Sequence, residues 1–432
     1  MTLQSLFRLD EHGTDVRTEI MAGVTTFLTM SYIVFVNPSI LSTTGMDHGA
    51  VFVATCLAAA LGTFIMAFVA NWPIGLAPGM GLNAFFAFTV VKGMGFSWQQ
   101  ALGAVFISGC VFVVLTLTGV RRWLVAGIPK SLRSAIAAGI GMFLAIIALS
   151  GAGIVVANPA TKVGLGDLHT LPVLLTTLGF LLIAVLDYFR LRGAILIGII
   201  AVTAASMLLG LTHFQGIVSM PPSIAPTLFK LDIPGALHAG FFHIILVFVL
   251  VEIFDATGTL TGLARKAGLL DGGREQGLGR ALFADSLAIF FGSLLGTSST
   301  TAYIESASGV QAGGRTGLTA VTVGVLFLAA LFFAPVAAVV PPYATAPALL
   351  YVAGLMMREL LEIDWQDVTE AVPSAMAALV MPFTYSIANG LAFGFIVYAA
   401  LKLLTGRARE WHPAMWFVAA LFLLRFVLFP AD

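Results

Sequence analysis

The amino-acid sequence predicts an all-α polytopic membrane protein with fourteen membrane-crossing segments, and three observations lead to this fold class. The first is composition. Of the 432 residues, 59% are hydrophobic and only 10% are Asp, Glu, Lys or Arg, whereas a soluble domain carries about 25% of these charged residues. Too few charges remain to cover the surface of a soluble fold. The same hydrophobicity excludes a disordered chain.

The second observation is the length of the apolar runs, such as LGTFIMAFVA and IILVFVLVEIF, because transmembrane barrels show short alternating segments instead. The third is their number. Divided at turn and charge signals, the runs give fourteen candidate segments, which are 19–41, 51–71, 74–91, 99–119, 132–151, 171–188, 193–211, 239–262, 279–295, 300–312, 316–338, 343–357, 372–387 and 388–404. A further apolar run, 413–429, is interpreted as an accessory segment.

The distribution of basic residues predicts the orientation of the chain. With residues 1–18 in the cytoplasm, seventeen of the 21 Lys and Arg residues fall on the cytoplasmic side, and Lys92, Lys162 and Lys230 fall outside. Arg425 lies in the last apolar run and is unassigned. This asymmetry follows the positive-inside rule and predicts a multi-pass protein of the plasma membrane, which is the inner membrane in a bacterium. The net charge of zero argues against nucleic acid as a partner. Membrane lipid is the partner that the apolar composition predicts.

The longest linker divides the predicted segments into two halves. Residues 212–238, on the outer side, separate seven segments in 19–211 from seven in 239–404, and 405–432 form the accessory C-terminal part. With an odd number of segments in each half, the second half must cross the membrane in the opposite sense. Such inverted repeats are typical of secondary transporters.

The third segment of each half cannot form a regular helix. The first of them reads WPIGLAPGMGLNAFFAF, and its proline and glycine residues break a helix. The second, LLGTSSTTAYIESASGV, is too short to cross as a helix and is rich in Ser and Thr. Interrupted segments at corresponding places in two halves indicate a binding site near the membrane midplane. Asn83, after the first break, and Thr301, within the second, are candidate substrate-binding residues.

Four acids lie well inside the predicted segments, namely Glu252, Asp255, Asp285 and Glu305. The Lys and Arg residues within the segment bounds, Arg133, Arg280 and Lys402, all lie within three residues of a segment end, so the segment interiors contain none. An ionisable side chain within the membrane indicates function. Without a basic partner, these acids must be protonated, bound to a cation or hydrogen-bonded. All four are therefore candidates for proton coupling, and sodium is not excluded. Glu252 and Asp285 are equally compatible with hydrogen bonds between helices.

The sequence argues against two other classes of function. An intramembrane enzyme could use paired carboxylates, but the sequence has no HExxH, Walker A or GxSxG motif. An anion exchanger of the same architecture should present a positive centre at the half-helix starts rather than two acids. No motif for a metal or a cofactor is present, so neither is expected. Gly258 and Gly262 are spaced for close helix packing.

At these residues the sequence resembles the AzgA-like branch of the nucleobase/cation symporter-2 (nucleobase–ascorbate transporter) family. The resemblance covers nearly the whole chain and is carried by GVTTFLTMSYIVFVNPSIL, APGMGLNAFFAF, IFDATGTLTG, GTSSTTAYIESASGV, AGGRTGLTA and MPFTYSIANGLAFGFIVY. It implies a core domain of segments 1–4 and 8–11, a gate domain of segments 5–7 and 12–14, and a short strand with a half-helix in segments three and ten. It also implies proton symport of the purines adenine, guanine and hypoxanthine, and a homodimer through the gate domain.

The resemblance assigns roles to individual residues. The family's substrate-binding acid on segment eight falls on Asp255, and its substrate contact on segment ten falls on Glu305. The main-chain groups offered to the base fall near Ala84 and Phe85, and the acid of segment nine falls on Asp285. A flat purine ring could also stack on an aromatic side chain, for which the candidates are Phe27, Phe85 and Phe254.

Overall fold

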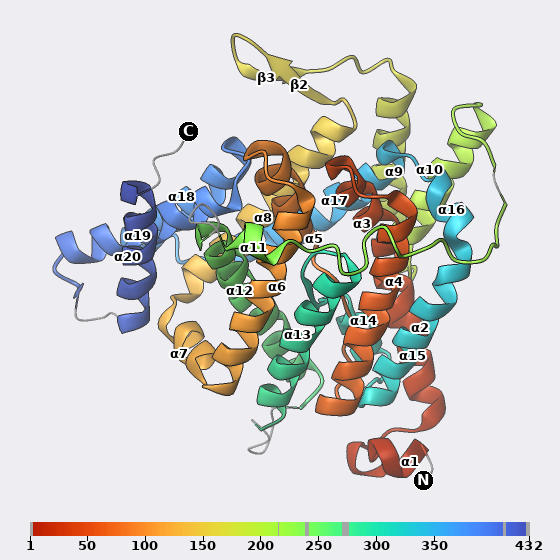
Figure 1. The fold of residues 1–432 in the computed structure, drawn as a ribbon, viewed down its shortest axis with the longest axis horizontal. Coiled ribbons are helices and arrows are strands. Elements are labelled where there is room, and N and C mark those ends of the chain that lie inside the picture. Colours follow the sequence, from red (N-terminus) through yellow and green to blue (C-terminus); the bar gives the residue numbers. More distant parts are fainter. Residues whose placement is uncertain (1–2, 215, 238–241, 270–275, 409–411, 429–432) are drawn as a thin grey trace.

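The computed structural model describes residues 3–214, 216–237, 242–269, 276–408 and 412–428, and it is mostly helical (Figure 1). The first half contains α1 (Leu3–Phe7), α2 (Val16–Met30), α3 (Ile33–Leu41), α4 (His48–Ile65), β1 (Leu76–Pro78), α5 (Met80–Ala84), α6 (Trp98–Leu117), α7 (Val120–Gly127), α8 (Lys130–Gly151), the hairpin strands β2 (Val155–Asn158) and β3 (Lys162–Leu165), α9 (Leu171–Tyr188) and α10 (Ala194–Leu208). π-helical turns at Met66–Ala70 and Phe85–Gly93 extend α4 and α5.

The second half begins after the predicted linker. It contains α11 (Ile233–Ala236), α12 (Phe242–Lys266), α13 (Gln276–Leu295), β4 (Thr300–Ala302), α14 (Ser306–Gln311), α15 (Gly317–Ala330), α16 (Ala334–Val339), α17 (Pro342–Met356), α18 (Val368–Phe383), α19 (Ile387–Leu404) and α20 (Pro413–Leu428). Parts of the predicted linker (212–238) and of the C-terminal part (405–432) lie outside the described residues.

Short polar side chains fix where several of these apolar helices begin. The Asp15 carboxylate accepts hydrogen bonds from the N–H groups of Arg17 and Thr18 at the start of α2. Ser97 and Gln100 form a reciprocal capping box at the start of α6. Such caps satisfy N–H groups that have no partner inside the helix, and they place helix starts that hydropathy alone leaves open.

Ten helices are long and apolar enough to cross a membrane by length and composition within the described ranges. Four shorter apolar helices lie at 80–93, 194–208, 368–383 and 413–427. The polytopic helical class is thereby confirmed, whereas the count of fourteen crossings stays a prediction. One predicted segment differs in shape, because 19–41 forms two helices, α2 and α3, that meet at Ser31 and Tyr32.

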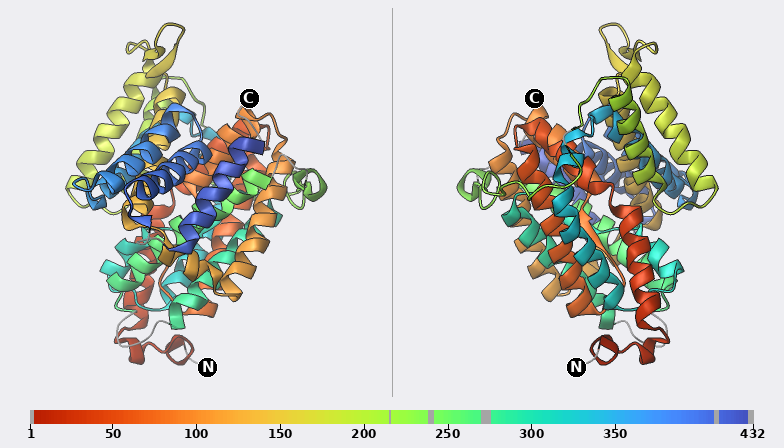
Figure 2. Two further views of the ribbon diagram at one scale, coloured as in Figure 1. Left: turned by 90° about the vertical axis from the view of Figure 1, so that its left-hand side faces the viewer. Right: turned by 90° about the vertical axis from the view of Figure 1, so that its right-hand side faces the viewer.

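The helices pack in two groups. In one, α13 contacts α4 and α6, α15 contacts α2 and α4, and α12 contacts α6 and α13. In the other, α8 contacts α17 and α18, α9 contacts α10 and α17, and α18 contacts α19. Figure 2 shows the yellow-green helices α9 and α10 beside the blue C-terminal helices, apart from the red, orange and teal helices of the first group. This grouping supports the predicted core and gate, which stay a proposal.

Glycine allows α14 to lie directly against α2. A Cβ on Gly309 would stand 2.7 Å from the Ala22 carbonyl oxygen and closer still to the Thr26 hydroxyl. We expect Gly309→Ala to destabilise the fold by about 1–3 kcal/mol, because α14 would have to move away. The matched control is Gly258→Ala. Contrary to the prediction of close helix packing, a Cβ added to Gly258 or Gly262 would meet no described atom within 4 Å. Thermal unfolding in detergent should show a lower unfolding temperature for Gly309→Ala than for Gly258→Ala.

Candidate functional site

The two broken segments meet in the interior of the protein. Strands β1 and β4 pair antiparallel, with Leu76 opposite Ala302, Ala77 opposite Thr301 and Pro78 opposite Thr300. Each strand is fully buried, and each is followed by a short helix, α5 or α14. The predicted strand and half-helix in segments three and ten are therefore both present, and the pairing brings residues from the two halves of the chain together.

The backbone N–H and carbonyl groups in and around these strands form hydrogen bonds with side chains as well as across the strand pair. The Thr63 hydroxyl donates to the Leu76 carbonyl oxygen and accepts from the Leu76 N–H, at 3.1 and 2.9 Å. The Gly75 N–H donates to the Ser306 hydroxyl at 3.0 Å, and the Tyr303 hydroxyl donates to the Pro78 carbonyl oxygen at 2.6 Å. Non-helical backbone can persist inside a membrane protein only where such partners surround it.

Asp255 and Glu305 lie together beside this strand pair, although they are 50 positions apart in the sequence. Their carboxyl groups, with the Tyr303 hydroxyl, are close enough for direct electrostatic interaction. Both side chains are half-buried. Glu305 accepts a hydrogen bond from the Tyr32 hydroxyl at 2.6 Å, whereas Asp255 accepts none from any described residue. An accessible carboxylate without a partner is available to a ligand that carries N–H groups.

Asp285 is fully buried, and the structure corrects the prediction that it has no basic partner. The Arg121 guanidinium lies 3.3 Å from the Asp285 carboxylate, and both side chains are at most 1% exposed. The second carboxylate oxygen accepts from the Thr301 hydroxyl at 3.3 Å and from the Ala302 N–H at 3.2 Å. Thr301 thus holds Asp285 against β4. The sequence placed Arg121 in a cytoplasmic loop, because no local pattern shows that α7 turns this side chain inward.

The Ser/Thr run before β4 engages the remaining polar candidates. The Ser299 hydroxyl donates to one oxygen of Glu252, and the Ser298 hydroxyl donates to the side-chain oxygen of Asn83. Glu252 and Asn83 are both fully buried. The other Glu252 oxygen and the Asn83 nitrogen have no partner among the described residues. Glu252 therefore connects α12 to the chain just before β4, and its second oxygen has no partner among the described residues.

The assignment of main-chain contacts to the region of Ala84 and Phe85 stays a prediction, and the structure places the N–H groups without an intrahelical partner earlier in the half-helix. Both residues lie past the first turn of the half-helix, and the Phe85 N–H donates to the carbonyl oxygens of Gly81 and Leu82. The N–H groups without an intrahelical partner belong to the start of a helix, which here begins at Met80. The sequence signal for this helix start was the Pro78-Gly79 pair that precedes Met80.

The three aromatic candidates all have aromatic neighbours. Phe27 packs edge-on against Phe327, with ring centroids 5.2 Å apart, and the fully buried Phe85 packs against Phe248 at 5.0 Å. Phe254 stacks on Phe395 of α19 at 6.0 Å. Phe85 is thus a packing residue. Phe27, on α2 before the break at Ser31 and Tyr32, and Phe254, on the helix that carries Asp255, stay candidates.

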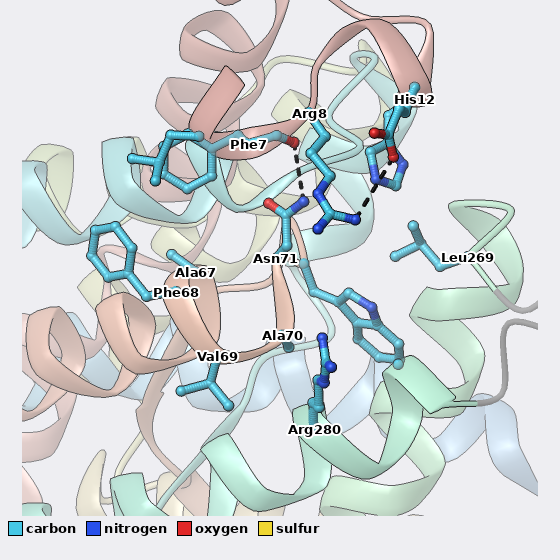
Figure 3. A pocket seen from close by; sticks show the side chains of 14 residues that line it. Phe7, Arg8, His12, Ala67, Phe68, Val69, Ala70, Asn71, Leu269 and Arg280 are labelled. Carbon is cyan, nitrogen blue, oxygen red and sulfur yellow. Dashed lines mark hydrogen bonds and ion pairs between the residues drawn. The ribbon is translucent and has the colours of Figure 1, made fainter. Parts of the chain in front are cut away.

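A cavity of about 570 Å³ lies elsewhere, at the end of the molecule that carries the N-terminus. Figure 3 shows it between the N-terminal segment, the end of α4 and α13, with Arg8, His12 and Arg280 around it. The Asn71 side chain donates to the Phe7 carbonyl oxygen at 3.0 Å and so anchors the N-terminal segment there. None of the predicted site residues lines this cavity. Across the described ranges, no cluster of three His, Cys, Asp or Glu side chains could hold a metal.

Membrane-length helices and two broken segments that pair in the interior form the architecture of a helical membrane transporter. The chain belongs to the permease family: Xan_ur_permease matches residues 17–402. The adenine permease AdeP of Escherichia coli (strain K12) is 50% identical over 430 residues, which are 99% of this chain and 97% of AdeP. The guanine/hypoxanthine permease PbuG of Bacillus subtilis (strain 168) is 45% identical over 98% of this chain and 99% of PbuG.

A solved structure has the same fold at low sequence identity. The transmembrane domain of a cyanobacterium bicarbonate transporter, BicA, matches with a TM-score of 0.65 and 16% identity, over 88% of this chain and 97% of that domain. At this identity the likeness concerns the fold alone. The substrate must therefore be argued from the residues of the site.

Proposed function

We propose that this protein is a secondary active transporter that imports purine nucleobases, with adenine, guanine and hypoxanthine as the substrate class. The observation that carries the proposal is the pair of carboxyl groups, Asp255 and Glu305, beside two paired broken segments. Relatives named as adenine and guanine/hypoxanthine permeases, at 50% and 45% identity over nearly full length, support the same class.

The chemistry of the site suits a purine. A purine presents ring N–H and amino donors beside nitrogen or oxygen acceptors. The free Asp255 carboxylate accepts from the donors, and the N–H groups at the start of α5, from Met80 onward, donate to an acceptor. Glu305, oriented by Tyr32, supplies a second acceptor. The flat ring would then lie between polar groups from both halves of the chain.

We further propose that a proton moves with the base and that the core moves against the gate. Protonation of a carboxyl group beside the strand pair, together with base binding, removes the charge of the site. The loaded site can then pass from one side of the membrane to the other. The candidates for this carboxyl group are Asp255, Glu305, Glu252 and Asp285. In this proposal the first half (19–211) and the second half (239–404) are inverted repeats, residues 1–18 lie in the cytoplasm, and two gates form a homodimer.

An anion exchanger of the same architecture is the second candidate, because BicA shares the fold. Its site should present an uncompensated positive charge to the ligand. Within the described part of this chain, Arg121 is the cation beside the strand pair, and its charge is matched by Asp285. The accessible groups are carboxylates, which repel bicarbonate and sulfate.

Binding distinguishes these candidates directly. The purified protein is heated in detergent with adenine, guanine, hypoxanthine, uracil, bicarbonate or sulfate, and its unfolding temperature is recorded. A ligand that binds the folded state raises this temperature. We expect the purines alone to do so. Stabilisation by bicarbonate or sulfate without any by purines would replace the proposal with the anion exchanger.

A further inference from the structure

Arg121 is the second residue of the short helix α7, which joins α6 to α8, and its side chain points into the protein rather than toward water. It is 1% exposed. Its Nε donates to the Thr257 hydroxyl of α12 at 3.1 Å, and Nη1 donates to the Leu282 carbonyl oxygen of α13 at 3.1 Å. The guanidinium carbon lies 4.0 Å from the centre of the Phe112 ring of α6. One side chain therefore contacts three helices of the group that contains the broken segments.

The third hydrogen bond of Arg121 leads to the broken segment through Asp285 of α13. Nη2 pairs with Asp285, and the other oxygen of that carboxylate accepts from Thr301 and Ala302 of β4. The chain of contacts runs from the connecting helix through the charge pair to the strand. Beyond that strand lies Glu305. Arg121 therefore contacts α12 at Thr257, two residues from Asp255, and through Asp285 it contacts the strand that precedes Glu305.

We propose that Arg121 is a positioning residue of the substrate site, and that it forms with Asp285 a permanently ionised pair which carries no transported proton. The inference rests on the proposed function and deepens it, because it removes Asp285 from the four candidates for coupling. It also assigns a role to a residue of the segment that connects the proposed core and gate.

Three physical arguments support this assignment. A guanidinium remains charged in proteins, so its buried partner Asp285 is more stable as the ionised carboxylate than as the neutral acid. The planar fork makes three hydrogen bonds in three directions here, which a lysine cannot reproduce. Among the described residues, the other ionisable side chains that interact with this pair are two acids of α12, Glu252 and Asp255. A proton on Asp285 would leave the Arg121 charge without its partner.

The test compares single and double replacements by uptake of labelled adenine into proteoliposomes. Arg121→Met leaves the Asp285 charge buried and unpaired, so we expect the KM for adenine to rise by about tenfold or more. Arg121→Lys should give an intermediate KM. The double variant Arg121→Met/Asp285→Asn removes both charges and keeps an acceptor for Thr301 and Ala302. It should transport better than Arg121→Met and should still respond to the ion gradient that drives wild-type uptake.

Arg265→Met is the matched control, because Arg265 is an exposed arginine on α12, and it should behave as wild type. Size-exclusion profiles identify variants that fail to fold, and if Arg121→Met is among them the double variant decides. A double variant that takes up adenine without response to the gradient would assign the transported proton to Asp285 and overturn the proposal. So would a wild-type KM in Arg121→Met. A wild-type protein that takes up no purine would instead refute the proposed function.

Discussion

Replacing Asp255 by Ala is expected to reduce adenine uptake by about a hundredfold or more, because a hydrogen bond to a charged group contributes about 1.5–3 kcal/mol and the donors of the base would be left unpaired. Asp255→Asn should be nearly as damaging, since its NH2 group can turn a donor toward the donors of the purine. Uptake of labelled adenine, with the amount of folded protein measured in parallel, gives the comparison.

Asp167→Asn provides the control for this change, because Asp167 is an exposed aspartate in the loop before α9. It should transport as wild type. If Asp255→Ala also kept wild-type uptake, Asp255 would not bind the substrate, and the free carboxylate beside the strand pair would need another explanation.

The second large effect is expected at Glu305. Glu305→Ala should reduce adenine uptake about as strongly as Asp255→Ala does, since it removes the other acceptor from the site. Tyr32→Phe removes only the hydroxyl that donates to Glu305 at 2.6 Å. We expect this variant to lose roughly tenfold in affinity, in line with the loss of one hydrogen bond to a charged group. The measurement is the KM for adenine at fixed pH.

Tyr188→Phe is the matched control for Tyr32→Phe, because the Tyr188 side chain is 81% exposed on α9. An unchanged KM in Tyr32→Phe together with an inactive Glu305→Ala would mean that Tyr32 does not orient Glu305. Wild-type transport in both variants would remove Glu305 from the site.

The fold could be predicted from the sequence where its physical causes are local. Proline and glycine interrupt 74–91, and a Ser/Thr-rich run interrupts 300–312, so irregular helices were expected there. The short strand and half-helix in each segment were implied by the family resemblance, and both are present. The division of 19–41 into α2 and α3 was missed. Its break at Ser31 and Tyr32 contains neither proline nor glycine, and apolar periodicity does not locate a kink of this kind.

The site could be predicted only in part, because its contacts join residues that are distant in the sequence. Asp255 and Glu305 were found from their charge inside apolar runs. Tyr32 and Arg121 were missed, since the first meets Glu305 273 positions away and the second meets Asp285 164 positions away. A tyrosine in an apolar run and an arginine near a segment end are common patterns. Only the packed fold shows that both point inward.

Accumulation of labelled adenine in proteoliposomes that carry a proton gradient tests the central claim most directly. The account predicts that wild-type protein concentrates adenine, that unlabelled guanine or hypoxanthine competes, and that an ionophore which collapses the gradient stops the accumulation. Asp255→Ala should show none of this. Accumulation that persists after the gradient is collapsed would contradict proton coupling, and the absence of any adenine uptake by wild-type protein would contradict the assignment of the site to purines.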